Sequence, residues 1–158
     1  MNKSTIPAQQ KAALSLLLDD HRNAKKLFKQ FQEAGSDSEK QDIAQTVCKE
    51  LTIHTMLEEE IFYPFIRKEG GDTFADMLDE AIVEHASAKE LIAQIQSMRP
   101  ADDMYDARVT VLCEYINHHV KEEEDEMFPK VVSKKIDLRE IAEMMMARKE
   151  ELMGTVPA

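Results

Sequence analysis

The chain contains the stretch His54-Thr-Met-Leu-Glu58-Glu-Glu-Ile-Phe-Tyr-Pro64 and repeats its pattern 65 residues later as His119-Val-Lys-Glu-Glu123-Glu-Asp-Glu-Met-Phe-Pro129. Each copy holds a His and a Glu four residues apart, and each ends with an aromatic residue and a proline. Positions i and i+4 of a helix lie on the same face. Imidazole and carboxylate together suit iron, manganese or zinc. The repeat therefore predicts two half-sites around metal.

The duplication extends upstream of both copies. Asp20-His21 precedes the first copy and Glu84-His85 precedes the second, 64 residues apart. Four of the five histidines therefore belong to one repeated pattern. The candidate metal ligands are His21, His54, Glu58, His85, His119 and Glu123.

Composition favours a helical protein with one domain. The 158 residues include only 4 glycines and 5 prolines, whereas Ala, Glu, Lys, Leu and Met are abundant. That balance is typical of helices rather than sheets. The length suffices for one sizeable core. The sequence therefore predicts an all-α fold.

The charge of the chain limits its partners. A formal net charge of −11 argues against nucleic acid or an anionic membrane as a partner, because both attract clustered Lys and Arg. The start, Met-Asn-Lys-Ser-Thr-Ile-Pro, lacks the apolar core of a signal peptide, and no run approaches the ~20 apolar residues of a membrane span. We therefore expect a cytoplasmic protein, as a monomer or a homodimer.

Glycine, proline and capping residues divide the sequence into four long helices and a short fifth. The expected helices run over about 7–34, 36–69, 72–98, 103–133 and 137–154. Ser36-x-x-Glu39 or Ser38 can cap the second helix, and Asp72-Thr73 can cap the third. The expected divisions are an N-terminal extension over 1–9, a four-helix bundle over 10–133 with repeats at about 10–69 and 72–133, and a C-terminal helix and tail over 134–158.

The six candidate ligands lie on the apolar seams of the four long helices. Counting about 1.5 Å per residue from each turn places them at one level of an up-down-up-down bundle. A single buried His is usually a core residue with a hydrogen-bonding neighbour. Two carboxylates at the same level need compensation, because burying an ionised group costs several kcal/mol. A pair of metal ions supplies it, and the alternative is a polar network of neutral His and protonated Glu.

Two choices of register remain open in the second repeat. His119 is preferred to His118 because it shares the seam and aligns with the first repeat, but His118 with Glu122 is the competing pair. Glu126 lies on the expected seam one turn beyond Glu123. It is left open as a seventh ligand or a hydrogen-bond acceptor.

Other residues near the repeats are interpreted as structural. The acidic side chains expected on solvated helix faces are Glu59, Glu60, Glu122, Glu124 and Asp125. Tyr115 is expected to line a pocket, whereas Tyr63 and Tyr105 are expected to be structural. Cys48 and Cys113 are expected to be reduced packing residues.

The order His, His-x-x-x-Glu, His, His-x-x-x-Glu, with an aromatic residue and proline after each second unit, resembles the hemerythrin-like domain family, also called the HHE cation-binding family. The resemblance covers roughly residues 10 to 133. It implies a four-helix up-and-down bundle around two iron ions with an oxo or hydroxo bridge, for which zinc or manganese could substitute. The resemblance implies that His21 and His54 bind one iron and that His85 and His119 bind the other. It implies that Glu58 and Glu123 bridge the two irons.

One departure bears on function. Oxygen-carrying members of the family have a second histidine one turn away on the third helix, whereas His85 is accompanied by Ala81 and Lys89. This departure argues against reversible oxygen storage. The resemblance implies a di-iron protein that binds or responds to O2, peroxide, nitric oxide or iron. The alternatives are an enzyme that breaks down peroxide or reduces O2 or nitric oxide, and a bundle that sequesters iron or zinc.

Overall fold

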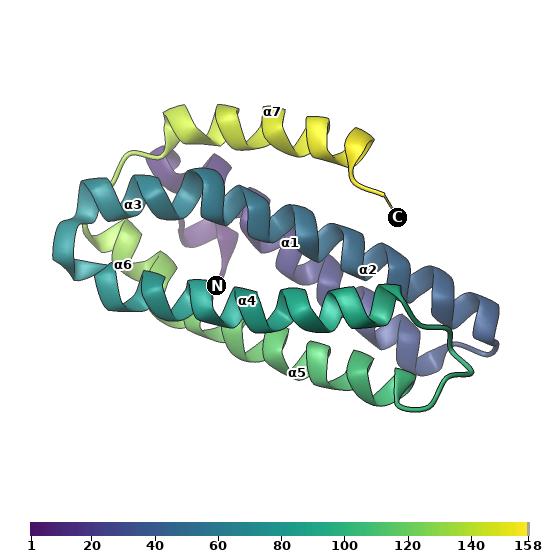
Figure 1. Cartoon of the computed structure of the whole chain (residues 1–158). Coiled ribbons are helices and arrows are strands. Elements are labelled where there is room, and N and C mark those ends of the chain that lie inside the picture. The colour runs from purple at the N-terminus through teal and green to yellow at the C-terminus, as the bar shows by residue number, and fades with distance from the viewer. Residues whose placement is uncertain (158) are drawn as a thin grey trace.

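The computed structural model describes residues 1–157, and every regular element in that range is helical (Figure 1). The predicted all-α fold is confirmed. The α-helices are α1 Ala8–Glu33, α2 Asp37–Leu57, α3 Tyr63–Gly70, α4 Ala75–Gln96, α5 Tyr105–Glu122, α6 Phe128–Ser133 and α7 Arg139–Thr155. Short 3-10 turns cover Lys3–Thr5 and Gly71–Thr73.

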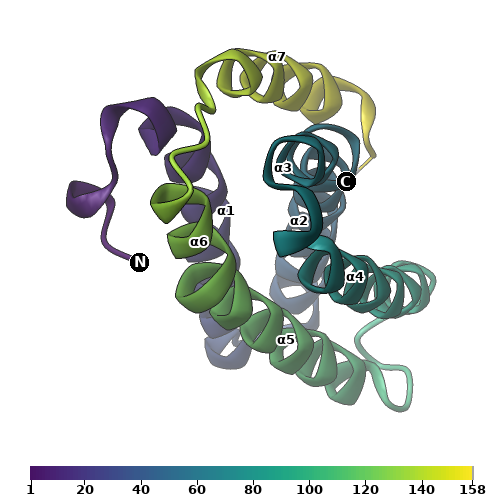
Figure 2. The same ribbon diagram turned by 90° about the vertical axis from the view of Figure 1, so that its left-hand side faces the viewer.

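Four long rods form the predicted bundle. They are α1, α2 continued by α3, α4, and α5 continued by α6, and they run up and down side by side (Figures 1 and 2). The fifth helix, α7, packs against α1 and α2 on the outside of the bundle. Within residues 1–157, no helix combines the length and the apolar character that a membrane crossing needs.

Of the two predicted helix caps, one forms and the other does not. The Ser36 hydroxyl accepts a hydrogen bond from the backbone N–H of Glu39 at 3.2 Å, and the Glu39 carboxylate accepts one from the N–H of Gly35 at 2.9 Å. Ser36 is therefore the N-cap, as predicted, and the Glu39 side chain reaches one residue farther back than in a standard capping box. The predicted cap at Asp72-Thr73 is wrong, because those residues form a 3-10 turn and α4 begins at Ala75 without a side-chain cap.

Two π-helical turns interrupt the second and fourth rods at equivalent places. They cover Glu58–Phe62 and Glu123–Met127, and in each the N–H five residues on donates to the carbonyl of the first Glu. Pro64 and Pro129 follow in the first turns of α3 and α6. A proline in an α-helix lacks the N–H for the carbonyl four residues before it and collides with that carbonyl. The wider turn accommodates the proline, and such turns often occur at functional sites.

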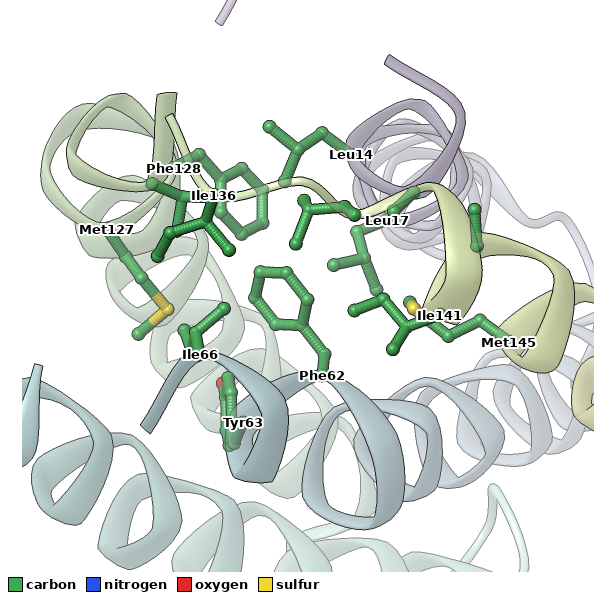
Figure 3. Packing of buried hydrophobic residues seen from close by; sticks show 14 of the residues in the cluster. Leu14, Leu17, Phe62, Tyr63, Ile66, Met127, Phe128, Ile136, Ile141 and Met145 are labelled. Atoms are coloured by element: carbon green, nitrogen blue, oxygen red, sulfur yellow. The ribbon is translucent and has the colours of Figure 1, made fainter. Parts of the chain in front are cut away.

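Two apolar clusters fill the bundle above and below a polar layer. One joins Leu14 and Leu17 of α1 to α3, α6 and α7, and Figure 3 shows their side chains meeting around Phe62. The other occupies the opposite end, where Phe28 of α1 packs with residues such as Leu112 of α5. The predicted ligands lie between these clusters in the sequence of every rod. Packing at both ends therefore fixes the four rods around that layer.

The turn between α3 and α4 requires glycine. A Cβ on Gly70 would overlap the buried ring of Phe74, whereas a Cβ on Gly154 in α7 would meet nothing within 4 Å. We expect Gly70→Ala to lower the free energy of unfolding by about 1–3 kcal/mol through overpacking. Gly154→Ala should leave it unchanged or raise it by up to about 1 kcal/mol, because Ala favours helix. Thermal unfolding of both variants tests this, and equal melting temperatures would contradict it.

Candidate metal centre

The six predicted ligands converge in the middle of the bundle. Each is 5% exposed or less, and Glu58 and Glu123 are 0% exposed. The four imidazoles come one from each rod, and the two carboxylates are the first residues of the two π turns. The structure therefore brings together all the residues that the repeat singled out, which are His21, His54, Glu58, His85, His119 and Glu123.

The Nε2 atoms of the histidines point at the two central carboxylates. Nε2 of His21 lies 3.0 Å from Oε1 of Glu123. Nε2 of His54 and Nε2 of His85 each lie 3.2 Å from Oε1 of Glu58. Nε2 of His119 lies 3.5 Å from Oε2 of Glu123. In the buried centre, ligand atoms within 4.8 Å of one another form two groups, namely His21, His54, Glu58 and Glu123, and Glu58, His85 and His119. A third group, Glu84, His118 and Glu122, lies toward the surface and contains the competing pair of the second repeat.

The opposite ring nitrogens are each held by an outer carboxylate. Asp20 lies 2.9 Å from Nδ1 of His54, Glu124 lies 2.8 Å from Nδ1 of His21, Glu59 lies 2.8 Å from Nδ1 of His85, and Glu84 lies 2.9 Å from Nδ1 of His119. A carboxylate can only accept, so each Nδ1 carries the proton and donates it. In a neutral ring Nε2 then presents its lone pair inward. This orientation is the one that metal-binding histidines use.

The outer carboxylates follow the sequence repeat. Asp20 and Glu84 each precede a central His, and Glu59 and Glu124 each follow a central Glu. The prediction that Glu59 and Glu124 lie on solvated faces is wrong, since their side chains are 26% and 16% exposed and bind imidazoles. Each turns toward the neighbouring rod rather than toward water. The 64- and 65-residue spacing of these acids was the available sequence signal.

Burial and neighbouring charges shift the pKa values of several residues in the centre in opposite directions. Burial alone would lower the pKa of His54, but Glu58 and Asp20 outweigh it and raise that pKa to about 10. Burial alone would raise the pKa of Glu58, but neighbouring His54 and other groups hold it well below its ordinary value. The same contest raises the pKa of His21 and of His119. Glu58 is therefore kept ionised by the positive charge beside it.

Buried atoms in the centre remain without partners. Neither carboxylate oxygen of Glu58 has a hydrogen bond, and neither does Nε2 of His54. An unsatisfied buried polar atom costs about 1–3 kcal/mol, and more when charged. Three such atoms, aimed at one another in a layer of imidazole and carboxylate, fit a bound cation. The donor set of nitrogen and oxygen suits iron, manganese or zinc.

Tyr63 makes the two halves of the centre different. Its hydroxyl donates to Oε2 of Glu123 at 2.6 Å and lies 3.3 Å from Nε2 of His119. The equivalent residue in the second repeat is Phe128, whose ring lies parallel to His21 with centroids 5.9 Å apart. Tyr63, which was predicted to be structural, therefore also contacts two of the predicted ligands. Burial and the charge of Glu123 raise its pKa well above the usual value, so the hydroxyl keeps its proton.

Comparison with known proteins identifies the family. The sequence matches the family described as hemerythrin HHE cation binding domain over residues 12–131. The chain belongs to this family. With the two His and Glu groups of the structure, membership supports a metal cofactor.

Two relatives of this hemerythrin-like protein extend the comparison. The crystal structure of a hemerythrin HHE cation binding domain-containing protein from Mycobacterium kansasii has a TM-score of 0.74 and 22% identity, covering 89% of this chain and 86% of that chain. It shows the shared fold. A protein named DNA nickase from Nostoc sp. is 29% identical over 109 residues, which are 69% of this chain and 30% of that protein. The chain thus spans less than a third of that relative.

Several residues that the sequence left open lie outside the hemerythrin-like centre. Glu126 is exposed, because the extra residue of the π turn moves the seam from Glu126 to Met127. Tyr115 is 48% exposed and does not line the cavity. His118 is 66% exposed and pairs with Glu122 at 2.8 Å on the surface. The structure places none of these three among the central groups.

A cavity of about 290 Å³ leads to the hemerythrin-like centre. It reaches the central imidazoles, and Leu51, Ile116 and Val120 provide apolar walls. Lys149 and Asp20 add charge to its lining. A small molecule therefore has a path to the layer of ligands.

The exposure of the two neighbouring histidines gives a direct test. We expect His119→Ala to lower the metal content of the purified protein strongly, because it removes a central imidazole 5% exposed. His118→Ala should leave metal content nearly unchanged, because that ring lies 66% exposed on the surface. Elemental analysis of both variants decides the matter. Equal losses would show that the register of α5 is wrong.

Proposed function

We propose that this protein holds two iron ions between the four rods and uses them to bind or respond to O2, peroxide or nitric oxide. One observation carries the proposal: four Nε2 atoms and the unpaired oxygens of Glu58 converge in a buried layer. His21 with His54 would hold one ion, His85 with His119 the other, and Glu58 with Glu123 would serve both. Bound iron would supply redox chemistry and positions open to a small ligand.

The side chains of this protein have defined tasks around such ions. The outer carboxylates orient the imidazoles through Nδ1 and raise their basicity. The apolar clusters at both ends exclude bulk water from the layer. Tyr63 keeps a proton 2.6 Å from Oε2 of Glu123 and is a proton donor within the centre. The cavity reaches the four central imidazoles and gives a small ligand its route to them.

The donor set argues for iron over a purely structural ion. Four imidazoles and two carboxylates match the mixed nitrogen and oxygen preference of iron, and neither cysteine belongs to the central groups. Six central side chains are too few for storage of many ions. An ion held only for stability also has no need of a cavity that reaches its ligands.

Peroxide breakdown is a second candidate, favoured by the Tyr63 hydroxyl, a proton donor that lies 3.3 Å from Nε2 of His119. Turnover of added peroxide, with O2 and water as products, separates an enzyme from a binding protein, which would show only a change in absorption. The name of the Nostoc relative does not transfer, because this chain spans 30% of it, and a net charge of −11 gives no reason to propose action on DNA.

The metal content of the protein tests the proposal. Protein purified after growth with added iron should contain two irons per chain, and its ferric form should show near-ultraviolet charge-transfer absorption that responds to nitric oxide or peroxide. Elemental analysis and absorption spectra provide both measurements. A fully helical protein that holds one zinc ion, or no metal, under these conditions would rule out the di-iron assignment.

The raised pKa of His54 predicts that protons and metal compete. In metal-free protein His54 stays protonated until the pH approaches about 10, so metal uptake at neutral pH must expel that proton. Calorimetry in buffers of different ionisation enthalpy should therefore show net proton release. The stabilisation that comes from protonated His54 is full below its ordinary pKa of about 6.5, and it is lost as pH rises toward about 10.

The melting temperature of the metal-free protein should accordingly fall between neutral pH and pH 10. A His54→Gln variant should show less proton release and a flatter pH profile of melting, because it cannot take up the proton. Metal binding without any buffer dependence would contradict the assignment of a protonated His54.

A further inference from the structure

Lys149 links the C-terminal helix α7 to the centre. This helix lies beyond the residues 12–131 that match the family, and it packs on the outside of α1 and α2 (Figure 1). Lys149 of α7 places Nζ 2.5 Å from Oδ1 of Asp20. Oδ2 of Asp20 lies 2.9 Å from Nδ1 of His54. A hydrogen-bonded path therefore runs from α7 to one of the four central imidazoles.

Lys149 also reduces the electrostatic repulsion between the carboxylates of Asp20 and Glu50. Asp20 and Glu50 both line the cavity, and Lys149 lies there with them. Burial and then the charge of Asp20 raise the pKa of Glu50, whereas Lys149 opposes this effect. The ammonium group thus offsets a repulsion that would otherwise disfavour Asp20 in its position on His54.

The second repeat has a different arrangement at the equivalent place. Glu84, the counterpart of Asp20, binds Nδ1 of His119 with one oxygen and lies 3.4 Å from Nε2 of His118 with the other. Both partners of Glu84 belong to α5, within the bundle. Asp20 therefore depends on α7 for its cation, and Glu84 does not.

We infer that Lys149 is a positioning residue for the metal centre, which holds Asp20 against His54 and so makes the half-site of His21 and His54 depend on the docking of α7. The consequence for metal rests on the proposed function, whereas the link from Lys149 to His54 does not. Because the second half-site lacks a ligand tied to α7, loss of Lys149 should act on one ion of the two.

The first experiment examines the link in metal-free protein, with the full chain. The His54 ring is observed by nuclear magnetic resonance, where a hydrogen-bonded Nδ1–H gives a downfield signal that exchanges slowly with water. Lys149→Met should weaken or abolish this signal, and Lys149→Arg should restore it. Arg148→Met is the matched control, because Arg148 also ties α7 to the bundle but pairs with Glu60 at 3.0 Å.

The second experiment measures release of iron from loaded protein to a chelator. Lys149→Met should speed the release of one ion by about tenfold or more, which is typical when a partner behind a metal-binding histidine is lost. The other ion should leave at the rate of the unmodified protein. In an Asp20→Asn background the Lys149→Met change should add little, since both act on one path.

The outcomes separate the two proposals. An unchanged His54 signal in Lys149→Met, or an equal loss of signal in Arg148→Met, overturns the role of Lys149. Faster release of both ions to the same extent also overturns it, because that result indicates general loosening of the bundle. A chain that takes up no iron but loses the His54 signal in Lys149→Met refutes the proposed function and leaves the positioning role in place.

Discussion

Two fully buried carboxylates surrounded by four imidazoles are the constraint on which this structure depends. Glu58 and Glu123 are 0% exposed, and an ionised carboxylate in an apolar interior is costly unless positive charge lies beside it. Outer carboxylates fix the imidazoles by Nδ1 and turn every Nε2 inward. Positive charge at the centre can then come from protons on the imidazoles or from metal ions. The bundle is therefore arranged around a cation, and its apolar ends hold that arrangement in place.

The π turns connect this electrostatic layer to the packing beneath it. Phe62 and Tyr63 lie at the end of the first π turn, and both are buried. Phe62 joins the apolar cluster, and Tyr63 reaches the carboxylate of Glu123. One wider turn thus allows a single segment to supply a candidate ligand, a hydrogen-bond donor and a core residue.

The sequence predicted the residues up to the first position of each π turn and failed within the turns. His54 lies on regular α-helix, and the N–H of Glu58 still bonds to the carbonyl of His54, so the i and i+4 rule holds between them. Glu126 was placed on the seam because the same rule was continued through a turn that has one extra residue. Glu59 was missed for another reason. It follows a buried ligand and looks solvated in a helical projection, although its repeat in Glu124 was a sequence signal. The packing of α4 beside it shows that it binds His85.

The sequence repeat gives the centre its approximate symmetry, and a few residues differ between the two halves. The repeat provides the same ligand pattern twice, so a symmetrical site would need nothing else. Tyr63 of the first repeat corresponds to Phe128 of the second repeat. Only one half of the centre therefore has a hydroxyl as a proton donor. The second partner of Asp20 is Lys149, whereas the second partner of Glu84 is His118. A permanent positive charge therefore supports Asp20, and a titratable imidazole supports Glu84. Two ions in such a site would experience different fields, which makes it possible for one to take a ligand while the other keeps its place.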